Sequence, residues 1–171
     1  MNRHSPDKLP PVRRFALLAM AAFLTLAFAG CPQSLEEEAL VGPETDGFVT
    51  IGSQRVEIEL ANTPETMSKG LGYRDSLAWG SGMYFTYPQP GLYRFWMKGM
   101  RFAIDIIWIR DGRIVDLSPD VPFEKDGNGP TVQPRQAANA VLEVPAGYSA
   151  ASGWRIGDRV RVELTGEAGA R

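Results

Sequence analysis

The chain has 171 residues, a formal net charge of −2, one cysteine and one histidine. A single cysteine excludes a disulfide framework within the chain. The mildly acidic composition, with no basic run, is unlike that of a nucleic-acid-binding protein, so we expect no nucleic-acid partner.

The first 30 residues have the layout of a secretory signal peptide. Four basic residues lie before an apolar run over residues 15–28, and small residues follow it. At ~1.5 Å per residue this run is too short to cross a hydrocarbon core of ~30 Å. We therefore expect residues 1–30 to be an export signal that is removed from the mature protein.

A candidate lipidation site stands where this signal ends. Phe28-Ala29-Gly30-Cys31 resembles the lipobox of bacterial lipoproteins, although Leu is usual at the position of Phe28. In such proteins the cysteine is acylated and becomes the first residue; the alternative is an ordinary cleavage site with Cys31 as a small residue. Residues 31–46 are rich in Pro, Gly and Glu, as in a disordered tether. We expect an exported domain, lipid-anchored through Cys31 to a membrane of the bacterial cell envelope.

Loss of the signal changes the chemistry that the domain can perform. His4 leaves with residues 1–30, and an acylated Cys31 has no free thiol. This excludes Ser-His-Asp and Cys-His catalysis as well as His-ligated zinc, so we expect no metal and no cofactor. Four of the 18 basic and one of the 20 acidic residues are lost, which leaves 14 against 19 and a net charge of −5.

Residues 47–166 are predicted to form one domain, followed by a C-terminal tail over residues 167–171. The alternation in residues 48–51 and 56–60 predicts a hairpin. Thr63 followed by Pro64 then predicts the start of a short helix, with Thr63 as its N-cap.

Short strands dominate the rest of the domain. Strands are predicted over residues 83–85, 93–98, 104–110, 113–115, 141–144 and 160–164, with one helical turn within 148–154. Asp111-Gly112 predicts a type I′ hairpin turn. The pattern favours a mainly β fold, a single-domain β-sandwich or partly closed barrel with one or two short helices. Residues 116–139, with four prolines and two glycines, are expected to form a long loop, either an insertion or a lid.

Several segments resemble a known family when taken in their order along the chain. They are GLGYRDSL (70–77), GMYFTY (82–87), YRFWMKGM (93–100), IDIIWI (104–109), DGRIV (111–115), VLEVPAG (141–147) and GDRV (157–160). Together they are similar to the prokaryotic family called domain of unknown function 192 (DUF192), over about residues 48–164. The resemblance implies a compact, mainly β fold and no established activity. Gly99-Met100 stands where the family usually has Asn-Thr, which removes two hydrogen-bonding side chains beside Lys98.

A candidate ligand site begins with three residues of the 93–98 segment. In an extended strand Arg94, Trp96 and Lys98 share one face. Two cations around an indole form either a sheet exterior, with the indole under aliphatic stems, or a wall for an anion or a sugar.

Asp105 interrupts the most apolar strand of the sequence and needs a partner there. An ionised carboxylate among isoleucines would be costly unless paired, and Arg74, Lys98 and Arg101 are the candidate partners. Such a pair is either purely structural or also lines a pocket. On the second reading, Arg74 and Asp105 join Arg94, Trp96 and Lys98 in a ligand-binding site, covered in part by residues 116–139.

These observations favour a membrane-tethered envelope domain that binds a small polar or anionic ligand or a saccharide, with no catalytic residue assigned. One alternative is a hydrolase or lyase that uses Asp105 with Lys98, or Asp105 with Glu143 as a pair of carboxylates. The other is a protein-interaction module that docks through an exposed sheet edge or apolar patch.

Overall fold

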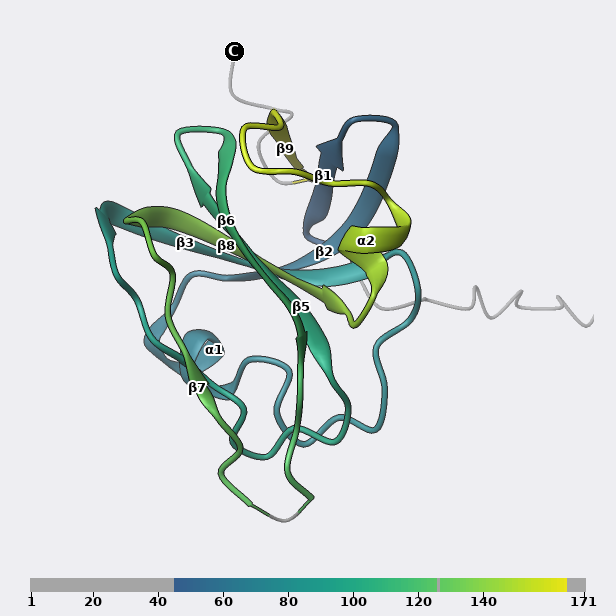
Figure 1. Ribbon diagram of the computed structural model, residues 1–171, viewed down its shortest axis with the longest axis vertical. Helices are drawn as coiled ribbons and strands as arrows, with labels where there is room; N and C mark the ends of the chain where they lie inside the picture. The colour runs from purple at the N-terminus through teal and green to yellow at the C-terminus, as the bar shows by residue number, and fades with distance from the viewer. Residues whose placement is uncertain (1–44, 126, 166–171) are drawn as a thin grey trace, which may run out of the picture. The chain divides into compact units, whose positions relative to one another are not determined.

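The computed structural model describes residues 45–125 and 127–165, all of which belong to one compact unit (Figure 1). The predicted signal peptide, Cys31, most of the tether and the C-terminal tail lie outside the described residues. Within the described part of the chain, no helix is both long enough and apolar enough to span a membrane.

The described residues form short strands and two short helices. In chain order they are β1 (Gly47–Ile51), β2 (Gln54–Ala61), α1 (Pro64–Lys69), β3 (Ser81–Gly91), β4 (Phe95–Trp96), β5 (Ile104–Arg110), β6 (Arg113–Val121), β7 (Thr131–Val132), β8 (Ala138–Pro145), α2 (Tyr148–Ala151) and β9 (Val160–Leu164). Seven of these strands form one sheet in the order β6-β5-β8-β3-β2-β1-β9, and β4 pairs with β7 separately. Only β2 and β3 run parallel in the large sheet, and α1 lies in the connection between them.

The large sheet curls into a half-barrel whose two ends approach each other. The N–H of Val160 donates to the carbonyl of Gly112 at 2.8 Å. The N–H of Gly157 donates to the carbonyl of Ile114, also at 2.8 Å. These bonds join the start of β6 to the segment that leads into β9. The predicted mainly β class, in its partly closed barrel form with two short helices, is confirmed.

Local sequence signals place the hairpins and the first helix correctly. Thr63 caps α1: its hydroxyl accepts the N–H of Thr66, and the Thr66 hydroxyl accepts the N–H of Thr63. At the β5–β6 turn, Asp111 and Gly112 have φ angles of 52° and 71°. Both values are positive, as a type I′ turn requires, so the predicted hairpin is confirmed.

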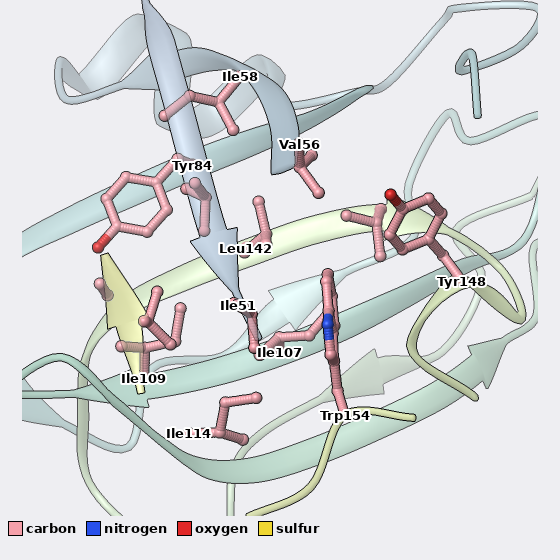
Figure 2. Packing of buried hydrophobic residues seen from close by; sticks show 14 residues of the cluster. Ile51, Val56, Ile58, Tyr84, Ile107, Ile109, Ile114, Leu142, Tyr148 and Trp154 are labelled. Atoms are coloured by element: carbon pink, nitrogen blue, oxygen red, sulfur yellow. The ribbon is translucent and has the colours of Figure 1, made fainter. Parts of the chain in front are cut away.

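The sheet carries a hydrophobic core on each face. The first core, shown in Figure 2, contains Val49, Ile51, Val56, Ile58, Tyr84, Ile107, Ile109, Leu142, Tyr148 and Trp154. The second core contains Ala61, Leu71, Met83, Phe85, Met97, Met100, Ile104, Ile106, Trp108 and Val141. Since α2 supplies Tyr148 to the first core and Leu71 follows α1 into the second, the two helices cover opposite faces.

Two sequence predictions about strands and loops are corrected. The strand predicted over residues 93–98 is only Phe95–Trp96, and the predicted 116–139 loop contributes Asp116–Val121 to β6 and Thr131–Val132 to β7. β6 is an edge strand, where a proline can be accommodated because one side of the strand needs no partner. The buried Asp116 carboxylate is satisfied by the N–H of Leu117 and by the backbone and guanidinium of Arg135.

The prediction that a cation neutralises Asp105 is wrong. Asp105 is 1% exposed, and its carboxylate accepts the N–H groups of Asp120, Gly147 and Ser149 at 2.8–3.0 Å. The Ser149 hydroxyl donates a fourth hydrogen bond at 2.6 Å. Within the described residues no cation pairs with this carboxylate. Backbone donors can satisfy a buried carboxylate without a countercharge, and here they connect β5 to the end of β6 and to the start of α2.

We expect Asp105→Ala to lower the free energy of unfolding by roughly 3–5 kcal/mol, because several buried donors lose their acceptor. Urea unfolding would measure the loss. Asp75→Ala is the matched control, since Asp75 is 87% exposed and its ion pair with Arg101 should contribute no more than about 1 kcal/mol. Equal unfolding midpoints for the two variants would contradict the structural role of Asp105.

Candidate functional site

A cavity of about 110 Å³ opens on the second-core side of the sheet. We call it the inner cavity. Its polar lining comes from Ser68, Lys69, Arg94, Lys98 and Glu143, and its aromatic lining from Phe85, Tyr87, Phe95 and Trp96. The cavity therefore lies between strands β3 and β8, the end of α1 and the segment around β4.

Strand register places Glu143 at the floor of this cavity. Glu143 on β8 lies opposite Ile106 of β5 and Met83 of β3, and both of those residues belong to the second core. Val141, two positions earlier, shares that face and is fully buried. A carboxyl group therefore stands in a row where the neighbouring strands present apolar side chains.

The roof of the cavity depends on a close approach of two backbone segments. A Cβ at Gly72 would lie 3.0 Å from the carbonyl oxygen of Lys69 and 3.3 Å from that of Lys98. The N–H of Tyr73 donates to the carbonyl of Gly99 at 2.7 Å. These contacts fix the turn after α1 against the segment that carries Lys98, so the cations of both segments face one opening.

Glu143 is 6% exposed, and no described residue forms a hydrogen bond with its carboxyl group. Among the described residues, Trp154 Nε1 is the one side-chain nitrogen or oxygen that is both fully enclosed and without a hydrogen-bond partner. The Glu143 oxygens also have no partner, so they are not fully enclosed and can be reached from the cavity. Burial raises the pKa of Glu143 to about 8, and the charge of Arg74 offsets part of this effect. At neutral pH the cavity floor therefore presents a protonated carboxyl that can donate a hydrogen bond.

Three of the five predicted ligand-binding residues line this cavity together. Arg94 and Lys98 are exposed at its rim, and the Trp96 side chain is 59% exposed. Lys69 adds a third cation at the rim. No ion pair within residues 45–125 and 127–165 engages these three cations. The rim is locally basic although the whole chain is acidic.

The other two predicted residues, Arg74 and Asp105, lie elsewhere. Arg74 forms a bidentate ion pair with Glu59, with 2.6 Å between Nη2 and Oε2, and lines a separate surface depression. This pairing lowers the pKa of Glu59. Because Glu59 lies opposite Met83, it is two strands, or about 10 Å, from Glu143. Asp105 is on the first-core face and is satisfied by backbone donors there, so the structure does not bring all five residues together.

The aromatic wall of the inner cavity is held by ring contacts. Phe95 packs edge-on against Phe85, at 4.9 Å between ring centroids, and against Trp108, at 5.3 Å. Tyr87 stacks on Tyr93 at 3.6 Å. Burial raises the pKa of Tyr87 to about 12, so its hydroxyl keeps its proton at physiological pH.

Sequence reasoning missed Glu143 as the central residue of the site. The sequence suggested Glu143 only as the second carboxylate of a hydrolase, paired with Asp105. The signal that could have found it is a lone carboxylate in the apolar run Ala138–Pro145, because a strand so apolar is buried on both faces. In the described residues no group of His, Cys, Asp and Glu is arranged to hold a metal ion.

Comparisons with known proteins give a family and a fold. The family model DUF192, described as "Uncharacterized ACR", matches residues 47–162. No curated protein matches the chain. A solved protein of unknown function from Novosphingobium aromaticivorans DSM 12444 is 30% identical, with a TM-score of 0.61 over 67% of this chain and 83% of that one. A protein from Sinorhizobium meliloti 1021, provisionally assigned as a transcription regulator, is 26% identical, with a TM-score of 0.63 over 71% and 98%.

The raised pKa of Glu143 makes stability depend on pH. The unfolded chain releases this proton near pH 4.5 and the folded chain near pH 8, so the folded state holds the extra proton between those values. The free energy of unfolding therefore falls as pH rises through this window, by at most roughly 5 kcal/mol. Access of solvent through the opening of the cavity would reduce the effect, and we expect a loss of about 2–4 kcal/mol.

Urea unfolding between pH 5 and pH 9 would test this, with Glu143→Gln expected to lack the Glu143 contribution to the slope. Glu57→Gln is the matched control, because it makes the same substitution at an exposed position on β2 that does not line the inner cavity. A Glu143→Gln profile parallel to that of the wild type would contradict the buried, protonated state.

Proposed function

The chain belongs to the DUF192 family, a family of unknown function, and we propose that its domain binds a polar, acidic ligand at the inner cavity, with one polar group of the ligand against Glu143. The single observation that carries this proposal is the Glu143 carboxyl, nine-tenths buried and without a protein partner among the described residues. Leaving a buried polar group unpaired is costly, and a ligand in the cavity would supply the missing partner.

The residues around Glu143 indicate the kind of ligand. A protonated carboxyl donates a hydrogen bond from the floor, and the exposed cations Lys69, Arg94 and Lys98 favour negative charge at the rim. Trp96 presents an exposed ring beside them, and such a ring can pack against the apolar face of a sugar. A saccharide that carries a carboxylate combines all three requirements.

An enzymatic function has weaker support. A buried carboxylic acid with a raised pKa is suited to general acid catalysis, and this favours Glu143 over Asp105 as the candidate acid of a hydrolase. Glycoside hydrolysis needs a second, free carboxylate on the other side of the scissile bond. The nearest carboxylate on this sheet face, Glu59, is paired with Arg74 and lines a different depression, so the sheet itself offers Glu143 no free carboxylate as a partner.

The provisional assignment of one structural neighbour to transcription regulation finds little support in this chain. Helices that read DNA lie in the major groove and present several side chains to base edges. The described helices α1 and α2 have six and four residues, too few for that role.

Titration of the isotope-labelled protein with D-galacturonate, D-glucose, acetate and phosphate tests the binding proposal. We expect D-galacturonate to move the Trp96 indole resonance and to bind more tightly than D-glucose, because only the acid engages the basic rim. Lys98→Gln should weaken binding about tenfold through loss of one charged contact. Arg110→Gln is the control, since Arg110 is an exposed cation at the distant β5–β6 turn.

Two variants of the cavity floor separate its chemistry from its shape. Glu143→Leu should abolish binding, whereas Glu143→Gln should preserve it at pH 7, because the amide can still donate a hydrogen bond. Above pH 8 the wild type should lose affinity as its carboxyl ionises, and the Gln variant should not. Ligand-induced shifts that leave the Trp96 indole unmoved would refute the site.

The cellular location of the domain is a separate part of the proposal. The predicted export signal over residues 1–30 and the lipobox-like Phe28–Cys31 support anchoring to a membrane of the bacterial cell envelope. Intact-mass analysis of membrane-extracted protein is expected to show loss of residues 1–30 and an added acyl mass. Cys31→Ser should remove the acyl mass and release the protein from the membrane fraction. A mature wild-type form without acyl mass would rule out the anchor.

A further inference from the structure

A larger surface groove of about 400 Å³ adjoins the inner cavity. We call this second space the outer groove. Both spaces are lined by Ser68, Lys69, Trp96 and Lys98, and the outer groove adds Glu65 and Tyr73. The two spaces are therefore adjacent and share these four residues as a common wall, with the smaller space on the inner side.

The volumes of the two compartments set the size of the ligand. A cavity of 150 Å³ holds benzene, so the inner cavity, at about 110 Å³, accepts a substituent or part of a ring rather than a whole sugar. Pockets that hold complete small molecules are roughly 300–1,000 Å³, and the outer groove lies in that range. A ligand that reaches Glu143 must consequently extend over Trp96 into the outer groove.

Tyr73 is held at the outer groove in a conformation that a tyrosine rarely adopts. Its φ is 66°, in the left-handed region, and its side chain is 65% exposed. The ring lies over Gly99, where a Cβ would be 2.8 Å from the Tyr73 Cζ atom. Strained backbone conformations are most often found at functional sites. The positive φ of Tyr73 holds its ring beside the outer groove.

The charge of the outer groove is positive on balance. Its lining contains two cations, Lys69 and Lys98, and one carboxylate, Glu65. Both lysines also line the inner cavity. Two exposed aromatic side chains, Tyr73 and Trp96, stand beside these cations. Flat apolar faces next to fixed positive charges suit a ligand made of sugar rings that carry acid groups.

We propose that the site recognises the end of an acidic oligosaccharide. One substituent of the terminal sugar occupies the inner cavity against Glu143, and the terminal and following rings lie against Trp96 and Tyr73 with their acid groups near Lys69 and Lys98. This inference rests on the proposed ligand-binding function and adds that the ligand is a chain, bound by its end.

Calorimetry on the full chain with galacturonic acid and its dimer, trimer and tetramer tests the inference. Affinity should rise about tenfold from the monomer to the dimer or trimer, as the outer groove fills, and then level off. Tyr73→Gly removes the ring and suits the positive φ, so it should abolish this gain with chain length. Arg110→Gln should leave the gain unchanged.

The other outcomes separate the two proposals. Equal affinity for monomer and oligomers would overturn end recognition of a chain and leave ligand binding standing. Neutral maltooligosaccharides that bind as tightly as the acidic series would overturn the acidic class, and a gain with chain length only for oligoglutamate peptides would overturn the saccharide. Absence of binding by every compound would overturn both proposals.

Discussion

Strand β8 is covered on both faces, and this constraint determines the character of the site. It lies between β5 and β3 near the centre of the sheet, so alternate residues enter the first and second cores. The Glu143 side chain is consequently buried, whereas Glu57 on β2 is exposed to solvent. Its carboxyl group is stable there only as the neutral acid or with a partner in the cavity. This burial raises the pKa of Glu143 and is also the basis of its proposed role in ligand binding.

Two buried carboxylates show how partners decide between structure and function. Asp105 is enclosed by three backbone donors and a hydroxyl, which leave it no capacity for a ligand. Glu143 is nearly as buried, yet no described residue donates to it. Each residue is a single carboxylate within an apolar strand, so the local sequence pattern does not distinguish them. What separates them is the set of residues that the fold brings within reach.

The sequence was sufficient to predict those structural features that depend on neighbouring residues. Alternation in β2, the Thr63 cap and the Asp111-Gly112 turn each depend on residues a few positions apart, and each was predicted. The partners of Asp105 were not, because its donors lie 15, 42 and 44 positions away. Strand alternation predicted that Arg94, Trp96 and Lys98 lie on one side, and all three line the inner cavity. The reason for the position of Lys98 was not predicted. Strand β4 ends at Trp96, and Lys98 is held by the contact of its segment with the turn after α1.

Two glycines shape the roof of the site. Any side chain at Gly72 would press on the Lys69 and Lys98 carbonyls. Gly99 stands where Asn is usual, and a Cβ at that position would displace the Tyr73 ring. The absence of a side chain at Gly72 and at Gly99 therefore permits the close backbone contact beside Lys98 and leaves the Tyr73 ring exposed over Gly99.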